Sequence, residues 1–248
     1  MRFLIFLLIG SVAQFIDGSI GMGYGVTSSR LLISLGVYPG IASASLHTAE
    51  IFTTFVSGAF HLKLGNVQRN IAAPLIIPGV LGGILGAYLC TRIAATQLKP
   101  IVNIILLLMG LVILYQVAFK NFIQHRLKII SKNRLLPLGF FAGFIDALGG
   151  GGWGPIVTPT LVLNNIEPSK AVGSVDFTEF FVTVAEVIAF LIFLGPEKFR
   201  LDIVLILMLG GLITAPLAAI CCKRLPSRLL AMLVGIGVIL LSLYSLVR

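Results

Sequence analysis

Carboxylic acids inside apolar segments are the residues of this sequence best suited to chemistry. Six of the nine acidic residues fall within, or at breaks of, long apolar runs: Asp17, Glu50, Asp146, Asp176, Glu179 and Glu186. A carboxylate is costly to place in the middle of a bilayer, so it is usually kept for a function such as proton relay. The structural alternative is that these carboxylates accept hydrogen bonds from glycine-loop amides or from a neighbouring helix. An Asp just before a backbone break would then cap the broken backbone.

Two stripes of polar residues extend this set. A spacing of three, four and three residues places four of them on one helical face: His47, Glu50, Thr54 and Ser57. The residues 129 positions later form a matching face: Asp176, Glu179, Thr183 and Glu186. Together with Asp17 and Asp146, these faces predict a polar, proton-coupling pathway. Two alternatives stay open, namely hydrogen bonds that only hold helices together and, for His47, a satisfied core histidine.

The elements that must position these residues are built around two glycine-rich breaks. Phe15–Gly25 reads F-I-D-G-S-I-G-M-G-Y-G, and Phe144–Gly154, 129 positions later, reads F-I-D-A-L-G-G-G-G-W-G. Such breaks expose backbone N–H groups and helix N-termini, whose partial positive charge suits an anionic substrate. We therefore expect substrate to bind at Gly21, Gly23, Tyr24, Gly25, Gly150, Gly151, Gly152, Trp153 and Gly154. The two aromatic residues either wall this site or only pack.

The composition places the chain in a bilayer. Hydrophobic residues make up 58% and charged residues 11% of its 248 residues, with a mean hydropathy of +1.07, whereas a soluble domain carries roughly 25% charged residues. The length allows about eight to ten membrane segments of ~20 residues. The formal charge of +9 comes from basic residues between the apolar runs, which is typical of topology signals and not of nucleic-acid binding.

Two further features of the sequence bear on its processing and cofactors. The three cysteines, Cys90, Cys221 and Cys222, form no Cys-x-x-Cys pattern, so we expect neither a disulfide framework nor a metal site, and no cofactor. The N-terminus resembles a signal peptide. Because the second break follows the same kind of apolar lead, we expect the N-terminal segment to be retained.

The matching breaks belong to a longer internal repeat, which predicts an all-α polytopic membrane protein of two homologous halves. We assign residues 1–119 to the first repeat, 120–134 to a basic cytoplasmic linker and 135–248 to the second repeat. Each half should contain a pair of short helices broken by glycine, followed by three transmembrane helices. The predicted segments are Phe3–Ile16, Val26–Val37, Pro39–His61, Asn70–Cys90 and Ile101–Phe119, then Leu135–Phe144, Pro155–Leu163, Pro168–Leu194, Leu201–Cys222 and Leu229–Val247. A G-x-x-x-G face at Gly82 and Gly86 predicts close helix packing.

The relative orientation of the halves depends on how each short pair meets the membrane. If the pair dips in and returns, or if both short helices cross, each half crosses an odd number of times and the second half is inverted. If the pair forms one broken span, the halves are parallel. The basic residues between segments do not separate these cases. Glycine-broken short segments at equivalent positions are typical of inverted-repeat transporters, so we favour inversion, with both termini outside.

These motifs resemble those of the TauE/SafE family of membrane permeases, often called sulfite exporters. The resemblance rests on the duplicated Asp with its Gly-rich break and on a Pro-x-x-Ala-x-x-Ser motif that ends at Ser45 and at Ser174. It covers nearly the whole chain, and it implies transport of sulfite, sulfoacetate or other sulfur-containing anions across the cytoplasmic membrane. Ser45 and Ser174 join the candidate substrate-binding residues. The first break is followed by Ser29–Arg30 where the second has Thr158–Pro159, so the two half-sites should differ chemically.

The resulting hypothesis is a secondary transporter, or permease, for a small sulfur-containing anion. The sequence has no ATP-binding motif, so we expect an ion gradient to drive transport, with protons the natural choice. A passive anion channel and, with less support, an intramembrane enzyme are the alternatives. The expected partners are the anion and the lipid bilayer, without nucleic acid, and the oligomeric state stays open between a monomer and a homodimer.

Overall fold

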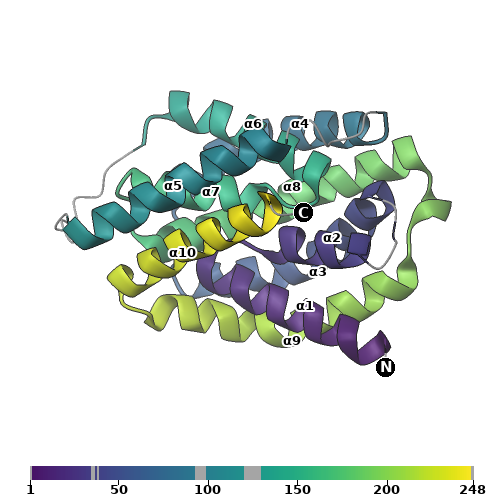
Figure 1. Cartoon of the computed structure of the whole chain (residues 1–248), viewed down its shortest axis with the longest axis horizontal. Coiled ribbons are helices and arrows are strands. Elements are labelled where there is room, and N and C mark those ends of the chain that lie inside the picture. The colour runs from purple at the N-terminus through teal and green to yellow at the C-terminus, as the bar shows by residue number, and fades with distance from the viewer. Residues whose placement is uncertain (1, 35–36, 38, 93–98, 120–129, 247–248) are drawn as a thin grey trace.

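The computed structural model describes residues 2–34, 37, 39–92, 99–119 and 130–246, and every regular element within these ranges is a helix (Figure 1). The first half contains α1 (Arg2–Ile20), α2 (Tyr24–Ser34), α3 (Pro39–Lys63), α4 (Arg69–Cys90) and α5 (Lys99–Phe119). The second half contains α6 (Lys132–Gly149), α7 (Trp153–Leu163), α8 (Pro168–Leu194), α9 (Leu201–Arg224) and α10 (Ser227–Leu246), with a short 3-10 helix, η2 (Pro196–Lys198), before α9. The predicted all-α fold class is confirmed.

Helix length and composition separate spanning helices from short ones. Within the described ranges, five helices are long and apolar enough to cross a membrane: α1, α4, α8, α9 and α10. The helix α3 is 25 residues long but carries the polar stripe predicted above. In contrast, α2 and α7 have 11 residues each. At ~1.5 Å per residue they are about 16 Å long, or half of the ~30 Å hydrocarbon core, so neither crosses it alone.

The first segment of each half is longer than predicted. The prediction that the chain opens with a short run, Phe3–Ile16, was wrong, because α1 continues to Ile20 and has 19 residues. Its polar end stays helical since the Ser19 hydroxyl donates to the Phe15 carbonyl at 2.5 Å, one turn back. Likewise, α6 has 18 residues where a ten-residue run was expected. Each glycine break therefore joins a long helix to a half-length helix.

The other helices follow the predicted segments closely. The helix α8 has the predicted bounds, α3 begins at its predicted proline, and the ends of α4, α5 and α9 differ from the prediction by at most two residues. Pro39 and Pro168 suit the first helical turn, where the backbone amide has no partner within the helix. Most of the predicted linker, residues 120–129, and the predicted end of the last segment at Val247 lie outside the described residues.

Helices from the two halves pack against each other in pairs. The helix α1 lies beside α9 in the same direction, since Gly10 meets the Leu207 backbone and Gly18 meets Ala218. The helix α6 lies beside α4, also in the same direction, with Gly82 against Phe140 and Gly86 against Phe144. Close packing at the G-x-x-x-G face is therefore confirmed. Figure 1 shows that α1 and α6 run in opposite directions.

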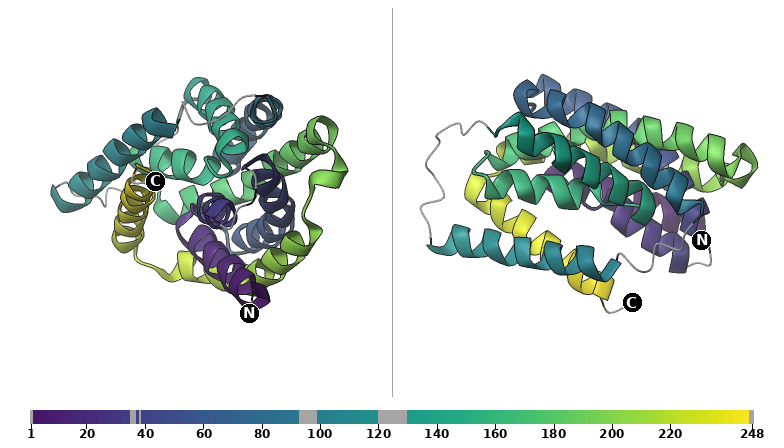
Figure 2. Two further views of the ribbon diagram at one scale, coloured as in Figure 1. Left: turned by 45° about the vertical axis from the view of Figure 1, so that its right-hand side comes forward. Right: turned by 90° about the horizontal axis from the view of Figure 1, so that it is seen from above.

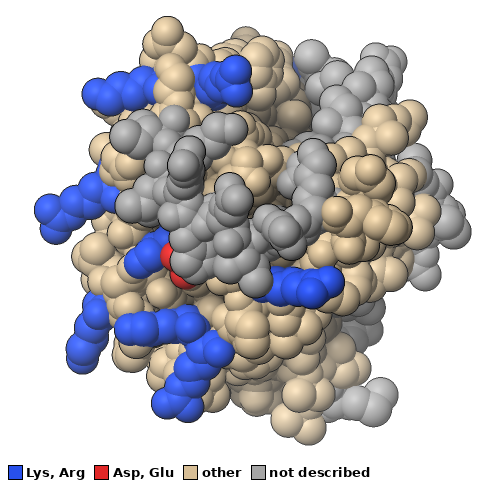
Figure 3. Space-filling model, turned by 90° about the vertical axis from the view of Figure 1, so that its left-hand side faces the viewer, with Lys and Arg blue, Asp and Glu red and all other residues tan. Residues whose placement is uncertain are grey.

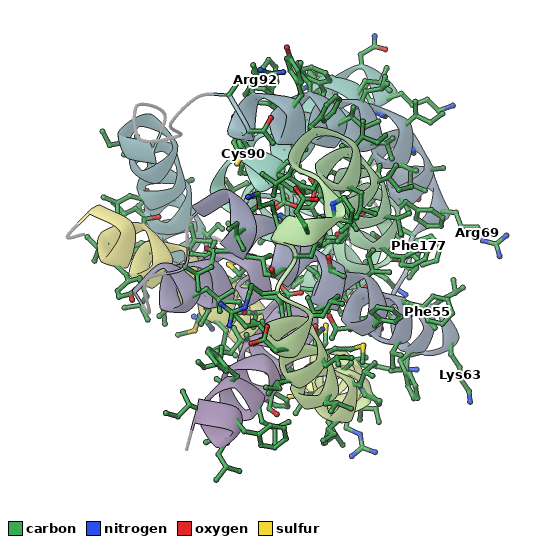
Figure 4. All side chains as sticks on the ribbon, turned by 90° about the vertical axis from the view of Figure 1, so that its right-hand side faces the viewer. Phe55, Lys63, Arg69, Cys90, Arg92 and Phe177 are labelled. Carbon is green, nitrogen blue, oxygen red and sulfur yellow. The ribbon has the colours of Figure 1, made fainter. Side chains whose placement is uncertain are left out.

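The centre of the bundle is the crossing of α3 and α8, which run antiparallel. Gly58 of α3 packs on the Phe177 backbone of α8, and Phe55 packs on Phe180 with ring centroids 5.4 Å apart. Figure 4 shows Phe55 and Phe177 projecting from the same edge of the molecule. The helices α5 and α10 pack on each other and form a layer at one side of the bundle (Figure 2).

Basic side chains gather at one end of the bundle. Figure 3 shows this end, which carries Lys and Arg side chains and little acidic surface. The loops and helix ends there include the end of α3, the starts of α4, α6 and α8, and the turn from α9 to α10. They contribute Lys63, Arg69, Lys132, Arg134, Lys170, Lys223, Arg224 and Arg228. By the positive-inside rule this pattern favours a cytoplasmic position for the basic end.

Candidate functional site

The two glycine breaks meet in the interior of the protein. Gly25 lies against Gly151, and a Cβ atom added to Gly25 would stand 2.6 Å from the Gly151 Cα. The Thr158 hydroxyl donates to the Gly21 carbonyl at 2.7 Å, and Gly154 packs on the same carbonyl. The sequence-predicted glycines are thus brought together, and the half-length helices α2 and α7 start from this common region.

The aspartates that precede the breaks bind the amides at the start of the half-length helices. Asp146 Oδ1 accepts hydrogen bonds from the amides of Gly152 at 2.5 Å and Trp153 at 3.1 Å. Asp17 Oδ1 accepts a longer one, at 3.5 Å, from the amide of Tyr24. Asp17 and Asp146 lie on the preceding helices α1 and α6, and these bonds satisfy backbone amides at the start of α2 and α7 that have no partner within the helix. The second oxygen of each carboxylate is buried and has no hydrogen-bond partner, so capping uses only half of each group.

The two aromatic residues of the breaks are fully buried. Trp153 is 0% exposed and its indole N–H donates to the Val175 carbonyl at 3.2 Å. Tyr24 is also 0% exposed, but its hydroxyl has no hydrogen-bond partner. Trp153 therefore packs as a satisfied core residue, while the buried Tyr24 hydroxyl faces the Thr53 hydroxyl in the interior.

One cluster of titratable groups surrounds His47. The His47 Nδ1 atom lies 2.8 Å from Glu50 Oε2 on the same helix and 3.4 Å from Glu186 Oε2 on α8. Donor atoms of His47, Asp146 and Glu186 all lie within 4.8 Å of one another. We call these four residues, His47, Glu50, Asp146 and Glu186, the histidine cluster. Protonated His47 would pair directly with its carboxylates.

A second cluster lies where α1 meets α8. Carboxylate oxygens of Asp17, Asp176 and Glu179 lie within 4.8 Å of one another, and we call these three residues the aspartate cluster. The His61 Nε2 atom is 3.6 Å from Asp176 Oδ2. Both oxygens of Asp176 are buried, and the Ser57 hydroxyl and the Asp17 carboxyl face this carboxyl group.

The two clusters are made of residues at equivalent positions. Asp17 and Asp146 are 129 positions apart, as are Glu50 and Glu179, His47 and Asp176, and Ser57 and Glu186. The clusters therefore share an Asp before the break and a Glu in the stripe. They differ because His47 in one stands where Asp176 stands in the other, and the Glu186 carboxylate stands where the Ser57 hydroxyl stands. The predicted chemical difference between the half-sites stays a prediction, and Arg30, on which it partly rests, has its side chain outside the described residues.

The remaining predicted residues have other partners. The Thr54 hydroxyl donates to the Glu50 carbonyl one turn back at 2.6 Å, whereas the Thr183 hydroxyl is buried without a hydrogen-bond partner. Ser45 accepts a hydrogen bond from the Arg200 amide at 3.1 Å, and Ser174 accepts one from the Gln68 amide at 2.8 Å. These two serines hold the residues just before α9 and α4, and their hydroxyls are occupied there.

Sequence reasoning missed two buried residues beside the aspartate cluster. His61 lies one turn beyond Ser57 on the same face of α3, so the spacing that found the stripe could have extended to it. Gln14 lies three residues before Asp17 on α1, and both atoms of its amide are buried without a hydrogen-bond partner. An isolated Gln in an apolar run is a weak signal, and nothing in the sequence singled it out.

Carboxyl groups dominate the buried titratable groups of the described residues. The six carboxylic acids of the two stripes and breaks are each at most 4% exposed, and no described lysine or arginine is buried. Among the described residues, only His47 and His61 contribute a group near these carboxylates that can become positive. Buried charges need partners of opposite sign, so protons or bound cations must balance this site.

Comparison with known proteins gives a family and a relative. The sequence model of the family described as "Sulfite exporter TauE/SafE" matches residues 6–245. The chain is 41% identical over 250 residues to the protein named "Probable membrane transporter protein YtnM" from Bacillus subtilis (strain 168), and the match covers 100% of this chain and 83% of that relative. No solved structure matches the chain.

Proposed function

Because the chain belongs to the TauE/SafE family of sulfite exporters, we propose that it is a secondary transporter for a small sulfur-containing anion. Sulfite and organosulfonates are the substrates we consider, and the cytoplasmic membrane is the barrier they cross. The family and the name of the relative point to a membrane transporter rather than an enzyme, and with five apolar helices the chain is a multi-pass membrane protein.

The meeting of the two glycine breaks is the observation that carries the proposal. The half-length helices α2 and α7 begin there, and a helix N-terminus attracts anions through its free amides and its dipole. Some of these amides are held by the Asp17 and Asp146 carboxylates. An arriving anion must therefore share the region with fixed negative charge, which favours a mechanism that brings positive charge along with the anion.

Protons are the proposed coupling ion, and the histidine cluster is the proposed relay. His47 contacts two carboxylates, Glu50 at 2.8 Å and Glu186 at 3.4 Å, from two different helices. A proton can pass along such a set of buried groups. The free Thr183 hydroxyl lies on α8 between Glu179 and Glu186, and it extends the polar pathway towards the aspartate cluster.

The proposed architecture is a pair of inverted repeats, residues 1–119 and 135–248, joined by the linker 120–134. Its support is that α2 and α7 begin 129 positions apart, at Tyr24 and Trp153, as do α3 and α8, at Pro39 and Pro168. The opposite directions of α1 and α6 (Figure 1) and the cross-pairing of α1 with α9 and α6 with α4 fit inversion. The basic end in Figure 3 is then cytoplasmic, and both termini are outside.

Uptake into proteoliposomes tests the function. We expect saturable uptake of radiolabelled sulfite, with competition by at least one of sulfate, thiosulfate, sulfoacetate and taurine, and acceleration by unlabelled anion on the opposite side. Counter-transport of this kind separates a transporter from a passive channel. Uptake that rises linearly with anion concentration and shows no counter-transport would favour the channel, and no uptake above empty liposomes for any of these anions would overturn the proposed substrate class.

A further inference from the structure

We infer that the aspartate cluster, Asp17, Asp176 and Glu179, binds a hard cation, one of the alkali or alkaline-earth ions. The inference rests on the proposed function and deepens it, because the ion supplies positive charge beside the region where the anion is proposed to bind. The site lies between α1 and α8, next to the first glycine break.

The donor atoms are close, buried and of one kind. Each of the three residues offers a carboxylate oxygen, and these oxygens lie within 4.8 Å of one another. The residues are 2%, 0% and 4% exposed. Three ionised carboxylates at this spacing in the interior repel one another strongly unless protons or another positive charge lie among them. Carboxylate oxygens are the ligands that hard cations prefer.

Unsatisfied neutral polar groups beside the cluster point to the same ligand. The Gln14 amide is 0% exposed and has no hydrogen-bond partner, and the Ser57 hydroxyl is also 0% exposed. They approach one point beside Gly18, since a Cβ atom there would lie 2.9 Å from Ser57 Oγ and 3.6 Å from Gln14 Nε2. The Ser57 hydroxyl also faces the Asp176 carboxyl. Buried polar groups are normally paired, and a bound cation would use the Ser57 oxygen as a ligand and the Gln14 amide through a water of its ligand shell.

His61 does not serve as the missing cation. Its Nδ1 atom lies 3.1 Å from the Asn66 amide nitrogen, which can only donate, so Nδ1 accepts. Its Nε2 atom lies 2.9 Å from the Gly18 carbonyl, which can only accept, so Nε2 donates. This pair of bonds holds the neutral tautomer. The 3.6 Å contact with Asp176 therefore leaves the negative charge of the cluster uncompensated.

In the histidine cluster, the group that can balance the charge of the carboxylates is a residue of the chain itself. There His47 replaces the equivalent of Asp176, and its ring nitrogen faces Glu50 and Glu186 directly. The histidine cluster thus has a positive group built into the chain. The aspartate cluster has a carboxylate at that position, so its positive charge must come from solution. One half carries a titratable histidine within the chain, and the other takes its positive charge from solution.

A cation-dependent melting experiment tests the site without any transported anion. Purified protein in detergent is melted in choline chloride and in NaCl, KCl, CaCl2 or MgCl2 at constant ionic strength. We expect at least one of these cations to raise the melting temperature by roughly 5–10 °C at a hundredfold excess over its Kd. Asp176→Asn should weaken the apparent affinity at least tenfold. If Asp176→Asn does not fold, Ser57→Ala serves instead as a smaller change in the same site. We expect it to weaken the apparent affinity by roughly threefold.

The control is Asp202→Asn, which removes an exposed carboxylate that pairs with Arg200 and should leave the cation response unchanged. A melting temperature equal in all salts overturns the inference, as does a response that Asp176→Asn and Ser57→Ala both retain, or one confined to a soft metal such as Zn²⁺. The experiments distinguish failure of the proposed transport function from failure of the proposed cation site. Absent anion uptake with an intact cation response overturns transport alone, and uptake without a cation response overturns this site alone.

Discussion

Substituting Gly151 by alanine should disrupt the point at which the two breaks meet. Gly151 has a φ of 139°, a conformation that costs other residues about 1–3 kcal/mol. An added Cβ would stand 2.5 Å from the Gly25 carbonyl carbon and would also meet the Val26 backbone nitrogen. Both are backbone atoms that cannot rotate away. Overpacking of this kind costs about 1–3 kcal/mol. Together these effects amount to about 2–6 kcal/mol, or a fall of roughly 5–20 °C in melting temperature for a chain of this size.

Two control glycines, Gly65 and Gly149, separate the cost of the backbone conformation from the cost of overpacking. Gly65 has a φ of 77° but open space around its Cβ position, so Gly65→Ala carries only the conformational cost, about 1–2 kcal/mol. Gly149 has open space and no positive φ, so Gly149→Ala should leave the melting temperature almost unchanged. The assay is thermal melting of the three purified variants, with anion uptake measured in parallel. If Gly151→Ala melts no lower than Gly65→Ala, the breaks do not pack backbone to backbone and the reasoning about the site fails.

Three further predictions address the serines, the coupling and the topology. Ser174→Ala should lower stability by about 1 kcal/mol through loss of the hydrogen bond to the residue before α4, and leave the KM for the anion unchanged; a large rise in KM would place this serine at the substrate. Glu50→Gln should reduce accumulation driven by a pH gradient at least fivefold while anion-for-anion exchange persists, as measured in proteoliposomes. Undiminished accumulation would make this carboxylate structural. On a cysteine-free background, cysteine in place of Lys63 should react with a membrane-impermeant reagent only from the cytoplasmic side, and cysteine in place of Lys198 only from outside; the same side for both would contradict inversion.

Patterns within one helix were predictable from the sequence. The spacing of His47, Glu50 and Thr54 predicted a buried polar face on α3, because the helical period alone decides which side chains share a face. The starts of α3 and α8 at prolines were predictable for a similar local reason. The end of α1 could not be predicted from the sequence. The Ser19 hydroxyl donates to the Phe15 carbonyl inside the helix, and no sequence pattern indicated this hydrogen bond.

Which helices meet, and in which register, could not be predicted from the sequence, although the G-x-x-x-G face at Gly82 and Gly86 predicted close packing. That His47 meets Glu186, and Asp176 meets Ser57, depends on the register of two antiparallel helices, which no local pattern records. The same holds for His61, whose neutral tautomer is set by the Gly18 carbonyl and the Asn66 amide from other parts of the chain. Ser45 and Ser174 each accept a backbone hydrogen bond that the sequence motif did not predict, and their assignment to the substrate stays a prediction.

The pairing of α1 with α9 has a consequence for the order in which the protein assembles. Gly10 packs on Leu207, so nearly 200 residues separate the two partners along the chain. At ~5–20 residues per second, α1 waits roughly 10–40 s for α9 to be synthesised. The helix α6 needs no such delay, because its partner α4 is already made when α6 emerges. The α4–α6 pair can therefore form early, whereas α9 can close over Gln14 on α1 only when most of the chain has been made.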